Sequence, residues 1–176
     1  MTLDPFAEVP IAVRRSPSTS YRNVRWSDAA SVMPFQRKRH HGAKKLGVEY
    51  EQRVCDVLEA IYGEAFVRAP AIRYFTNNGP KAAILDGLLR LDDQVLIIEV
   101  KLAHTERVWE QLMDRYLPLV GALEPGATIR PVEICRSYDP AVRLPGLHTL
   151  ITSIHENGLW PGRAPCVGLE VLRWRI

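Results

Sequence analysis

The feature that most constrains this chain is an apolar run that ends in charged residues. Val95-Leu96-Ile97-Ile98 is followed at once by Glu99-Val100-Lys101. An unbroken apolar run is typical of a central strand buried on both faces, where a lone surface ion pair would be out of place. The ordinary alternative for a Glu-x-Lys sequence is an exposed pair on a solvated strand. We therefore expect a strand over residues 94–102 whose last residues bring charge close to the core.

A second strand is predicted just before it. Residues 82–91 also have strand character, and Asp92-Asp93 supplies a short polar turn. If the hairpin is symmetric about that turn, Asp86 lies directly opposite Glu99, with Cβ atoms about 5 Å apart. The two-residue period of a strand places Lys101 on the same face as Glu99. One face of the hairpin then gathers two carboxylates and an ammonium.

Two carboxylates placed opposite each other call for compensation. Like charges across a ladder are destabilising unless a cation lies between them or one carboxyl is protonated. Hard oxygen ligands that leave room for water suit Mg²⁺, or Mn²⁺ as a substitute, better than zinc. We expect Asp86 and Glu99 to hold such an ion without help from His or Cys.

Helices and strands alternate along the rest of the chain. We expect helices over residues 46–63, 105–123 and 147–157, and strands over residues 72–75, 82–91, 94–102, 128–135 and 167–174. Pro118 should bend or shorten the second helix, and Pro131 favours an edge position or a bulge in its strand. This order indicates an α/β fold around a mixed sheet.

The first 45 residues differ in charge from the rest. Residues 1–45 hold nine Lys/Arg and three Asp/Glu, a balance of +6, whereas residues 46–176 carry −3. We expect an extended or partly ordered basic arm before a domain at 46–176. Such an arm suits DNA, because each neutralised phosphate releases counterions, although a solvated tail that binds nothing is the alternative. The candidate DNA contacts are Arg37, Lys38, Arg39, Lys44 and Lys45.

Composition sets further bounds. A chain of 176 residues with 47% apolar residues can form one domain with a sizeable core. No apolar run approaches the length of a membrane span, and the N-terminus lacks a secretory pattern, so we expect a cytoplasmic protein without a membrane partner. Cys55, Cys135 and Cys166 form no CxxC pair, which predicts buried, reduced thiols.

Asp86, a twelve-residue interval and Glu99-Val100-Lys101 resemble the signature of the PD-(D/E)XK nuclease superfamily. The element order over residues 46–135 is similar to that superfamily's αβββαβ core. The resemblance implies a restriction-endonuclease-like fold, a mixed central sheet flanked by helices, and Mg²⁺-dependent hydrolysis of DNA phosphodiester bonds. One departure is that Ile84-Leu85 precedes the first acid, where the family often has a proline.

The resemblance also implies roles for the motif residues. Asp86 and Glu99, with the Val100 carbonyl, would hold the metal ion against the scissile phosphate. Lys101 would orient the attacking water or help to deprotonate it. These roles are expectations from the family, and they agree with the two-carboxylate face that the strand period predicts.

Two further residues come from the same resemblance. Many members carry a Glu on the helix before the motif, and Glu51 is preferred to Glu49 because it shares a helical face with Val54. The alternative for Glu51 is a solvated acid near a helix start. Gln111 resembles the Gln of the exonuclease-like branch and could contact a metal-bound water or a phosphate. An ordinary surface glutamine is the alternative.

Other functions compete with the nuclease. A non-catalytic DNA-binding or assembly module would use the basic arm, but it would gain nothing from two carboxylates packed near an anionic ligand. An RNA or single-strand nuclease would need stacking aromatics, which are 8% of residues. A dimer or larger nucleoprotein assembly fits a domain of this size. His104 near Lys101, and His148 with His155 on the third predicted helix, are weaker site candidates.

Overall fold

The computed structural model describes residues 21–32, 42–92, 94–151 and 168–176. Its strands are β1 (Arg22–Ser27), β2 (Phe66–Arg68), β3 (Ala71–Thr76), β4 (Gly79–Ile84), β5 (Gly87–Leu91), β6 (Gln94–Ala103), β7 (Thr128–Ser137), β8 (His148–Ile151) and β9 (Leu169–Arg173). Its helical segments are η1 (Ala29–Ser31), α1 (Ala43–Tyr62), η2 (Gly63–Ala65), α2 (Arg107–Trp109), the π-helical η3 (Glu110–Tyr116) and α3 (Leu117–Leu123).

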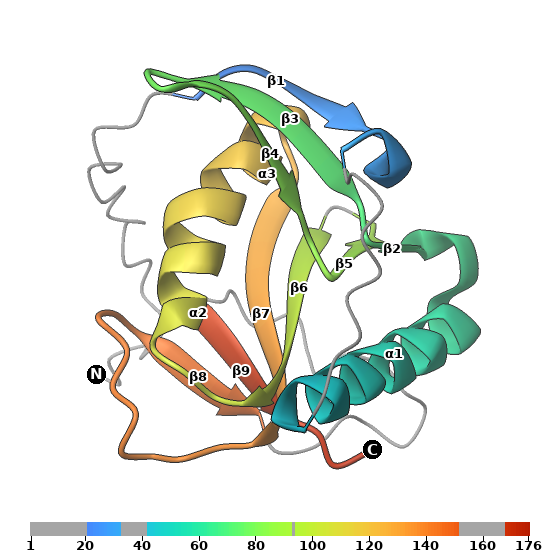
Figure 1. The fold of residues 1–176 in the computed structure, drawn as a ribbon, viewed down its shortest axis with the longest axis vertical. Coiled ribbons are helices and arrows are strands. Elements are labelled where there is room, and N and C mark those ends of the chain that lie inside the picture. Colours follow the sequence, from blue (N-terminus) through green and yellow to red (C-terminus); the bar gives the residue numbers. More distant parts are fainter. Residues whose placement is uncertain (1–20, 33–41, 93, 152–167) are drawn as a thin grey trace, which may run out of the picture.

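The strands form two sheets (Figure 1). The central sheet has the order β2-β5-β6-β7-β9-β8, and a smaller sheet has the order β1-β3-β4. The central sheet is mixed, because β5 runs antiparallel to β6 while β7 runs parallel to it. The predicted α/β class with a mixed central sheet flanked by helices is therefore confirmed.

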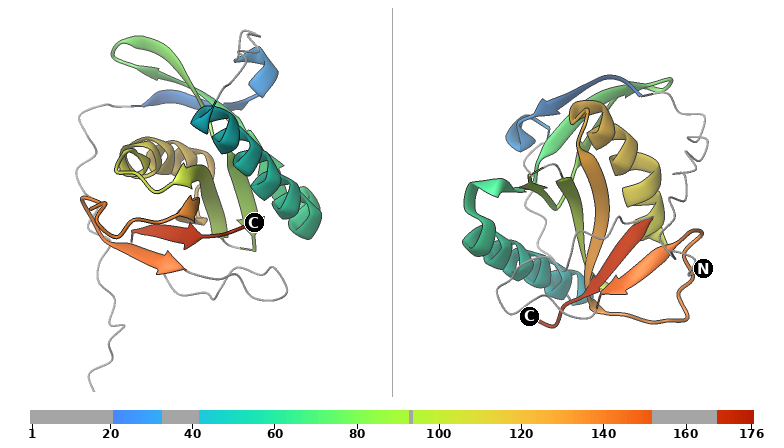
Figure 2. Two further views of the ribbon diagram at one scale, coloured as in Figure 1. Left: turned by 60° about the horizontal axis from the view of Figure 1, so that its bottom comes forward. Right: turned by 180° about the vertical axis from the view of Figure 1, so that it is seen from behind.

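Alternation along β6 sorts its side chains between two layers. Leu96, Ile98 and Val100 pack in one cluster with residues of α1, whereas Val95 and Ile97 pack in another with residues of the α2–η3–α3 run. The helices consequently cover opposite faces of the central sheet, an arrangement that the turned views in Figure 2 also show. The predicted direction of Ile98 and Val100, away from Glu99 and into the core, is confirmed.

The first predicted helix is confirmed with a slightly earlier start. Tyr50, Val54 and Leu58 are buried at helical spacing, and the helix ends as expected at Gly63. Gly63 has φ 53°, and its N–H donates to Glu59 O. A left-handed glycine of this kind is a common way to end a helix.

The hairpin register is confirmed, but the length of its first strand is wrong. Leu91 pairs with Gln94 and Gly87 with Ile98, so the numbers of paired residues have the sum that the prediction gave. Residues 82–91 are nevertheless two strands rather than one. The chain changes sheet at Leu85-Asp86, where backbone bonds to Pro70 and Ala69 hold it: Leu85 N–H donates to Pro70 O, and Ala69 N–H to Asp86 O.

The predicted third helix is wrong where the structure describes it. Leu147, Leu150 and Ile151 have helical spacing, but His148–Ile151 form β8, parallel to β9. Such a short apolar pattern fits a strand as well, and pairing with β9 decides between them. Ile154 and His155 lie outside the described residues. The last strand, β9, is confirmed within the predicted range.

For Pro131 the sequence predicts a bulge or an edge position at the start of its strand, and the structure shows an edge position limited to that start. β7 lies inside the sheet, between β6 and β9. Pro131 pairs with Ile97 of β6, while the pairing with β9 starts only at Val132. The missing N–H of Pro131 therefore lies beside the part of the strand where β9 has not yet begun, which explains how an interior strand accepts a proline.

The predicted basic arm contains regular structure. β1 pairs antiparallel with β3, and α1 already begins at Ala43. Lys44 and Lys45 are exposed in the first turn of α1, whereas Arg37, Lys38 and Arg39 lie outside the described residues. Cys55 and Cys135 are buried free thiols, as expected, and Cys166 is also outside the described part. None of the helices in the described part has the length and apolar character that crossing a bilayer requires.

Candidate active site

The candidate site lies where β6 continues past the end of β5. The hairpin pairing ends at Gly87 and Ile98, so residues 99–103 have β7 on one side and, within the described chain, no β5 residue on the other. Asp86, the residue just before β5, uses this gap. Its Oδ2 accepts a hydrogen bond of 2.7 Å from the Val100 N–H that the ladder leaves free. Asp86 therefore stands next to Glu99, as the predicted register requires.

Glu99 is buried, with only 1% of its surface exposed. Its Oε1 accepts a hydrogen bond from Lys101 Nζ, which confirms that the two side chains share a face. Its Oε2 is buried and has no hydrogen-bond partner within the described residues. A buried carboxylate oxygen without a partner is costly. We call Asp86, Glu99 and Lys101 together the acid site.

The electrostatics of the acid site reflect this crowding. Burial raises the pKa of Asp86, and burial together with Asp86 raises the pKa of Glu99 to about 7. Burial alone would lower the pKa of Lys101, but Glu99 and Asp86 outweigh it, so the pKa of Lys101 is raised. The lysine is thus held as an ammonium, while the two carboxylates compete for a proton or a cation.

A third carboxylate belongs to the same electrostatic group. Glu51 is half-buried on α1, and burial followed by repulsion from Asp86 raises its pKa to about 6. Glu49 is exposed and lies 3.6 Å from Lys45, in an ion pair along the helix. Of the two candidates on this helix, Glu51 is the one that couples to the acid site.

Gln111 lies on the π-helical segment that borders the site. Its Nε2 donates to the Tyr116 hydroxyl at 3.0 Å, and that hydroxyl donates to Ile84 O at 3.0 Å. Burial, and next Glu99, raise the pKa of Tyr116 to about 12. π-Helical turns are frequent at functional sites. Here the π-helical segment places Gln111 and Tyr116 against Ile84, two residues before Asp86.

Pro118 lies in the first turn of α3, directly after this π-helical segment. It cannot donate an N–H to a carbonyl one turn earlier. The carbonyl of Asp114, four residues before it, instead accepts a hydrogen bond of 3.2 Å from the Tyr21 hydroxyl. The helix continues to Leu123, so the expected shortening at Pro118 is not observed.

The site offers a small set of hard oxygen ligands. Within the described residues, no three His, Cys, Asp or Glu side chains converge closely enough to ligate one ion. Two carboxylates, Asp86 and Glu99, are available, and Glu99 Oε2 is buried without a partner. Two carboxylates completed by water and substrate oxygens suit Mg²⁺, which usually keeps several waters. The residues present therefore fit this ion.

A fourth acid, Glu133, lies beside Glu99 across the sheet, and we call Glu99 and Glu133 the acid row. It pairs with Glu99 in the parallel register of β6 and β7 and is fully buried. Burial raises the pKa of Glu133 to about 8 even though Lys101 lowers it, and Glu99 raises it further. Sequence reasoning missed this residue. The signal was present, because Val132-Glu133-Ile134-Cys135 is an apolar run broken by one acid, as at Glu99.

Glu133 also contacts a histidine, His104. Its Oε2 lies 2.6 Å from His104 Nδ1, and both side chains are buried. The His104 ring stacks on Tyr138 with centroids 4.9 Å apart, and His148 lies beyond it at 6.4 Å. Burial lowers the pKa of His104. Burial therefore favours the neutral form of both His104 and Glu133, and His104 contacts Glu133 rather than the acid site.

Comparison with models of known families, with curated proteins and with solved structures finds no match to this chain. The functional argument consequently rests on the geometry of the described residues.

Proposed function

We propose that the chain is a metal-dependent deoxyribonuclease that hydrolyses phosphodiester bonds at the acid site. The observation that carries this proposal is the close placement of Asp86 and Glu99, with one buried Glu99 oxygen that has no hydrogen-bond partner among the described residues. An arrangement of this kind is costly in a protein that only binds an anion, because it repels the ligand. It is useful where a divalent ion must be held beside a phosphate.

The residues of the chain divide the work. Asp86 and Glu99 would hold Mg²⁺ or Mn²⁺, with the Val100 carbonyl as a further ligand from the resemblance to PD-(D/E)XK nucleases. The bound ion supplies positive charge that offsets the negative charge developing on the phosphate. Lys101, kept as an ammonium by Glu99, is suited to orient the attacking water and to stabilise charge on the phosphate.

Two neighbours support these roles. Glu51 couples to Asp86 and can accept a proton near neutral pH, since its pKa is about 6. Gln111 can present its amide to a water or a phosphate oxygen next to the Tyr116 hydroxyl. Both groups reach the site from helices, so they can position water around the two carboxylates of the sheet.

The test is a cleavage assay on the purified chain. Linear, circular, single-stranded and branched DNA are incubated with Mg²⁺ or Mn²⁺, and EDTA is added in parallel. We expect metal-dependent cleavage of at least one substrate. Asp86→Asn and Lys101→Ala should each abolish cleavage and leave the circular dichroism spectrum unchanged.

Controls separate the nuclease from the rival functions. Glu49→Gln removes an exposed acid of the same helix as Glu51 and should cut DNA at the wild-type rate. Full-rate cleavage by Lys101→Ala would exclude the assignment. Binding of DNA without any cleavage would instead favour the non-catalytic DNA-binding module, and cleavage of RNA or single strands alone would favour that class of nuclease.

A further inference from the structure

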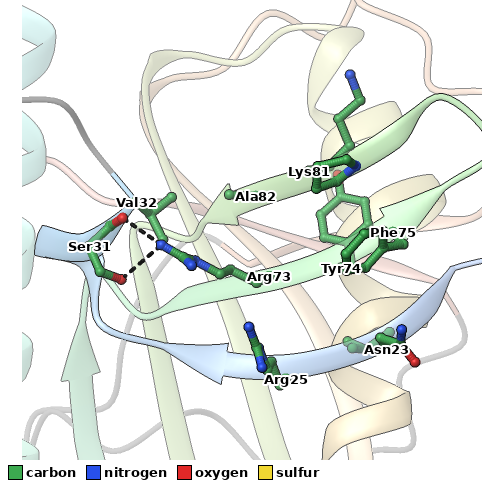
Figure 3. A pocket seen from close by; sticks show the side chains of 11 residues that line it. Asn23, Arg25, Ser31, Val32, Arg73, Tyr74, Phe75, Lys81 and Ala82 are labelled. Atoms are coloured by element: carbon green, nitrogen blue, oxygen red, sulfur yellow. Dashed lines mark hydrogen bonds between the residues drawn. The ribbon is translucent and has the colours of Figure 1, made fainter.

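A groove of about 800 Å³ lies along the small sheet (Figure 3), and none of the acid site residues is among those that line it. Its lining comes from β1, β3, β4 and the turn after η1. Three of the lining residues are cationic, namely Arg25, Arg73 and Lys81, and no Asp or Glu is among the residues that line the groove. Arg25 and Arg73 lie on one face of the small sheet, whereas Lys81 pairs with Tyr74 on the other face, so the positive charge of the shared face comes from β1 and β3. We call it the basic groove.

Arg25 and Arg73 are placed directly against each other. They are partners in the antiparallel register of β1 and β3, so their side chains share a face. Like charges at opposed positions are destabilising unless an anion lies between them. The two arginines repel each other as the two carboxylates of the acid site do, but here the charge is positive. The arrangement therefore favours an anionic ligand.

The partners of these cations within the described residues are neutral or absent. Arg73 Nη2 donates to Ser31 O at 2.6 Å and lies 3.3 Å from Ser31 Oγ. In the part of the chain that the structure describes, Arg25, Arg73 and Lys81 form no ion pair. By contrast, Arg68 and Arg90 each pair with an acid. The Ser31 contact orients one guanidinium without neutralising it.

We propose that the basic groove binds the phosphate backbone of duplex DNA. Guanidinium groups match phosphate oxygens in geometry, and phosphate contacts fix the position of a duplex without reading its sequence. The neutral contact of Arg73 with Ser31 preorganises such an interaction. The positive charge of the groove indicates an anionic ligand, and this inference is independent of the proposed function. The choice of DNA among anionic polymers rests on the proposed function.

The Ala82 end of the groove is joined to the acid site by a short stretch of chain. Ala82 lines the groove, and Asp86 follows it by four residues. Four residues of extended chain span at most about 14 Å. This separation corresponds to about four base pairs along a duplex axis. The basic groove would then hold the backbone a few nucleotides away from the phosphate that is cut.

Binding is measured by fluorescence anisotropy with a labelled duplex of about 20 base pairs and the full chain in EDTA, so that cleavage does not interfere. Arg25→Gln/Arg73→Gln should lower the affinity about 10- to 30-fold near 0.15 M salt and reduce the salt slope by about two. Arg25→Gln alone should lower it about 5-fold, and this change disturbs no described structural contact of Arg73.

The matched control removes the same charge elsewhere. Arg53 and Arg175 are exposed outside the groove, and Arg53→Gln/Arg175→Gln should stay within about 2-fold of the wild type. Equal losses in the two pairs would overturn the proposal. Groove-dependent binding of a Glu-rich peptide that duplex DNA does not displace would also overturn it.

The assay separates this proposal from the nuclease itself. If the chain binds DNA through Arg25 and Arg73 but never cleaves it, the proposal for the basic groove is supported and the nuclease proposal is contradicted. If the chain cleaves DNA but its affinity for DNA is unchanged when both arginines are substituted, the nuclease proposal is supported and the proposal for the basic groove is contradicted.

Discussion

The acid site and the basic groove present the same physical problem with opposite signs. In each, two like charges are neighbours: Asp86, just before β5, lies beside Glu99 of β6 in the first, and Arg25 of β1 lies opposite Arg73 of β3 in the second. They differ in burial. Glu99 is 1% exposed and one of its oxygens lacks a partner, whereas Arg25 is exposed.

This difference teaches which region depends on its ligand. Water screens the repulsion between exposed guanidinium groups, so the basic groove can stay empty at little cost. The buried Glu99 beside the half-buried Asp86 has little such screening, so the two carboxylates must take up a proton or a cation. We therefore expect the acid site to respond to pH and metal ions, and the basic groove to respond to salt.

The largest expected effect separates turnover from binding. Lys101→Ala should lower kcat by on the order of 10²- to 10⁴-fold, because an orienting group acts mainly in the transition state. Arg25→Gln should act on KM instead, raising it about 5-fold. Steady-state kinetics over a range of DNA concentrations measures both. If Lys101→Ala changed only KM, the assignment of turnover to the acid site and of binding to the basic groove would be wrong.

Metal addition comes next in size. At pH 8 and about 100 times its Kd, Mg²⁺ should stabilise the fold by about 2.7 kcal/mol, which corresponds to a rise in Tm of about 5–10 °C. EDTA should reverse this rise, and Asp86→Asn should remove it. Differential scanning calorimetry measures the change. An equal response in Asp86→Asn would place the ion elsewhere.

Without metal, stability should depend on pH in an unusual direction. The pKa values of Glu133, Glu99 and Glu51, about 8, 7 and 6, lie above the ordinary value of 4.5, so the folded state binds more protons than the unfolded state. Their contribution is full below about pH 4.5 and is lost as the pH rises through 6, 7 and 8.

The melting temperature in EDTA should therefore fall by a few degrees between about pH 5 and pH 8. Glu99→Gln should flatten this dependence, whereas the matched exposed variant Glu49→Gln should keep it. A metal-free protein that became more stable over the same range would contradict the crowding of the carboxylates.

The smallest effect concerns the basic groove without DNA. Arg25→Gln removes one of two opposed charges at an exposed position, so the free energy of unfolding should rise slightly or change by less than about 0.5 kcal/mol. Urea denaturation measures it. A loss well above that value would mean that Arg25 supports the fold rather than a ligand.

Part of the candidate site could be predicted from the sequence because it is local. The turn at Asp92-Asp93 and the period of two residues predict that Glu99 faces Asp86 and Lys101, and the register of β5 and β6 agrees. Glu51 was preferred to Glu49 from the face of a helix, and only Glu51 couples to Asp86. These relations span few residues, so period and turn geometry suffice.

Other parts depend on neighbours that the sequence does not name. The pairing of β1 with β3 and of β8 with β9 joins segments that lie far apart or carry ambiguous patterns. The same is true of Glu133, whose place beside Glu99 follows from a parallel pairing across an intervening helix. Long-range pairing of this kind leaves no periodic signal.

By itself, the sequence determined the buried strand that ends in Glu99 and Lys101 and the hairpin that turns Asp86 toward them, because side-chain alternation and turn length act within one short segment. Only the tertiary structure decided that the chain changes sheet at Asp86, that Glu133 lies beside Glu99 in the acid row, and that Arg25 meets Arg73 in a groove. Those outcomes depend on which distant strands pair, and pairing is selected by the packing of the whole core.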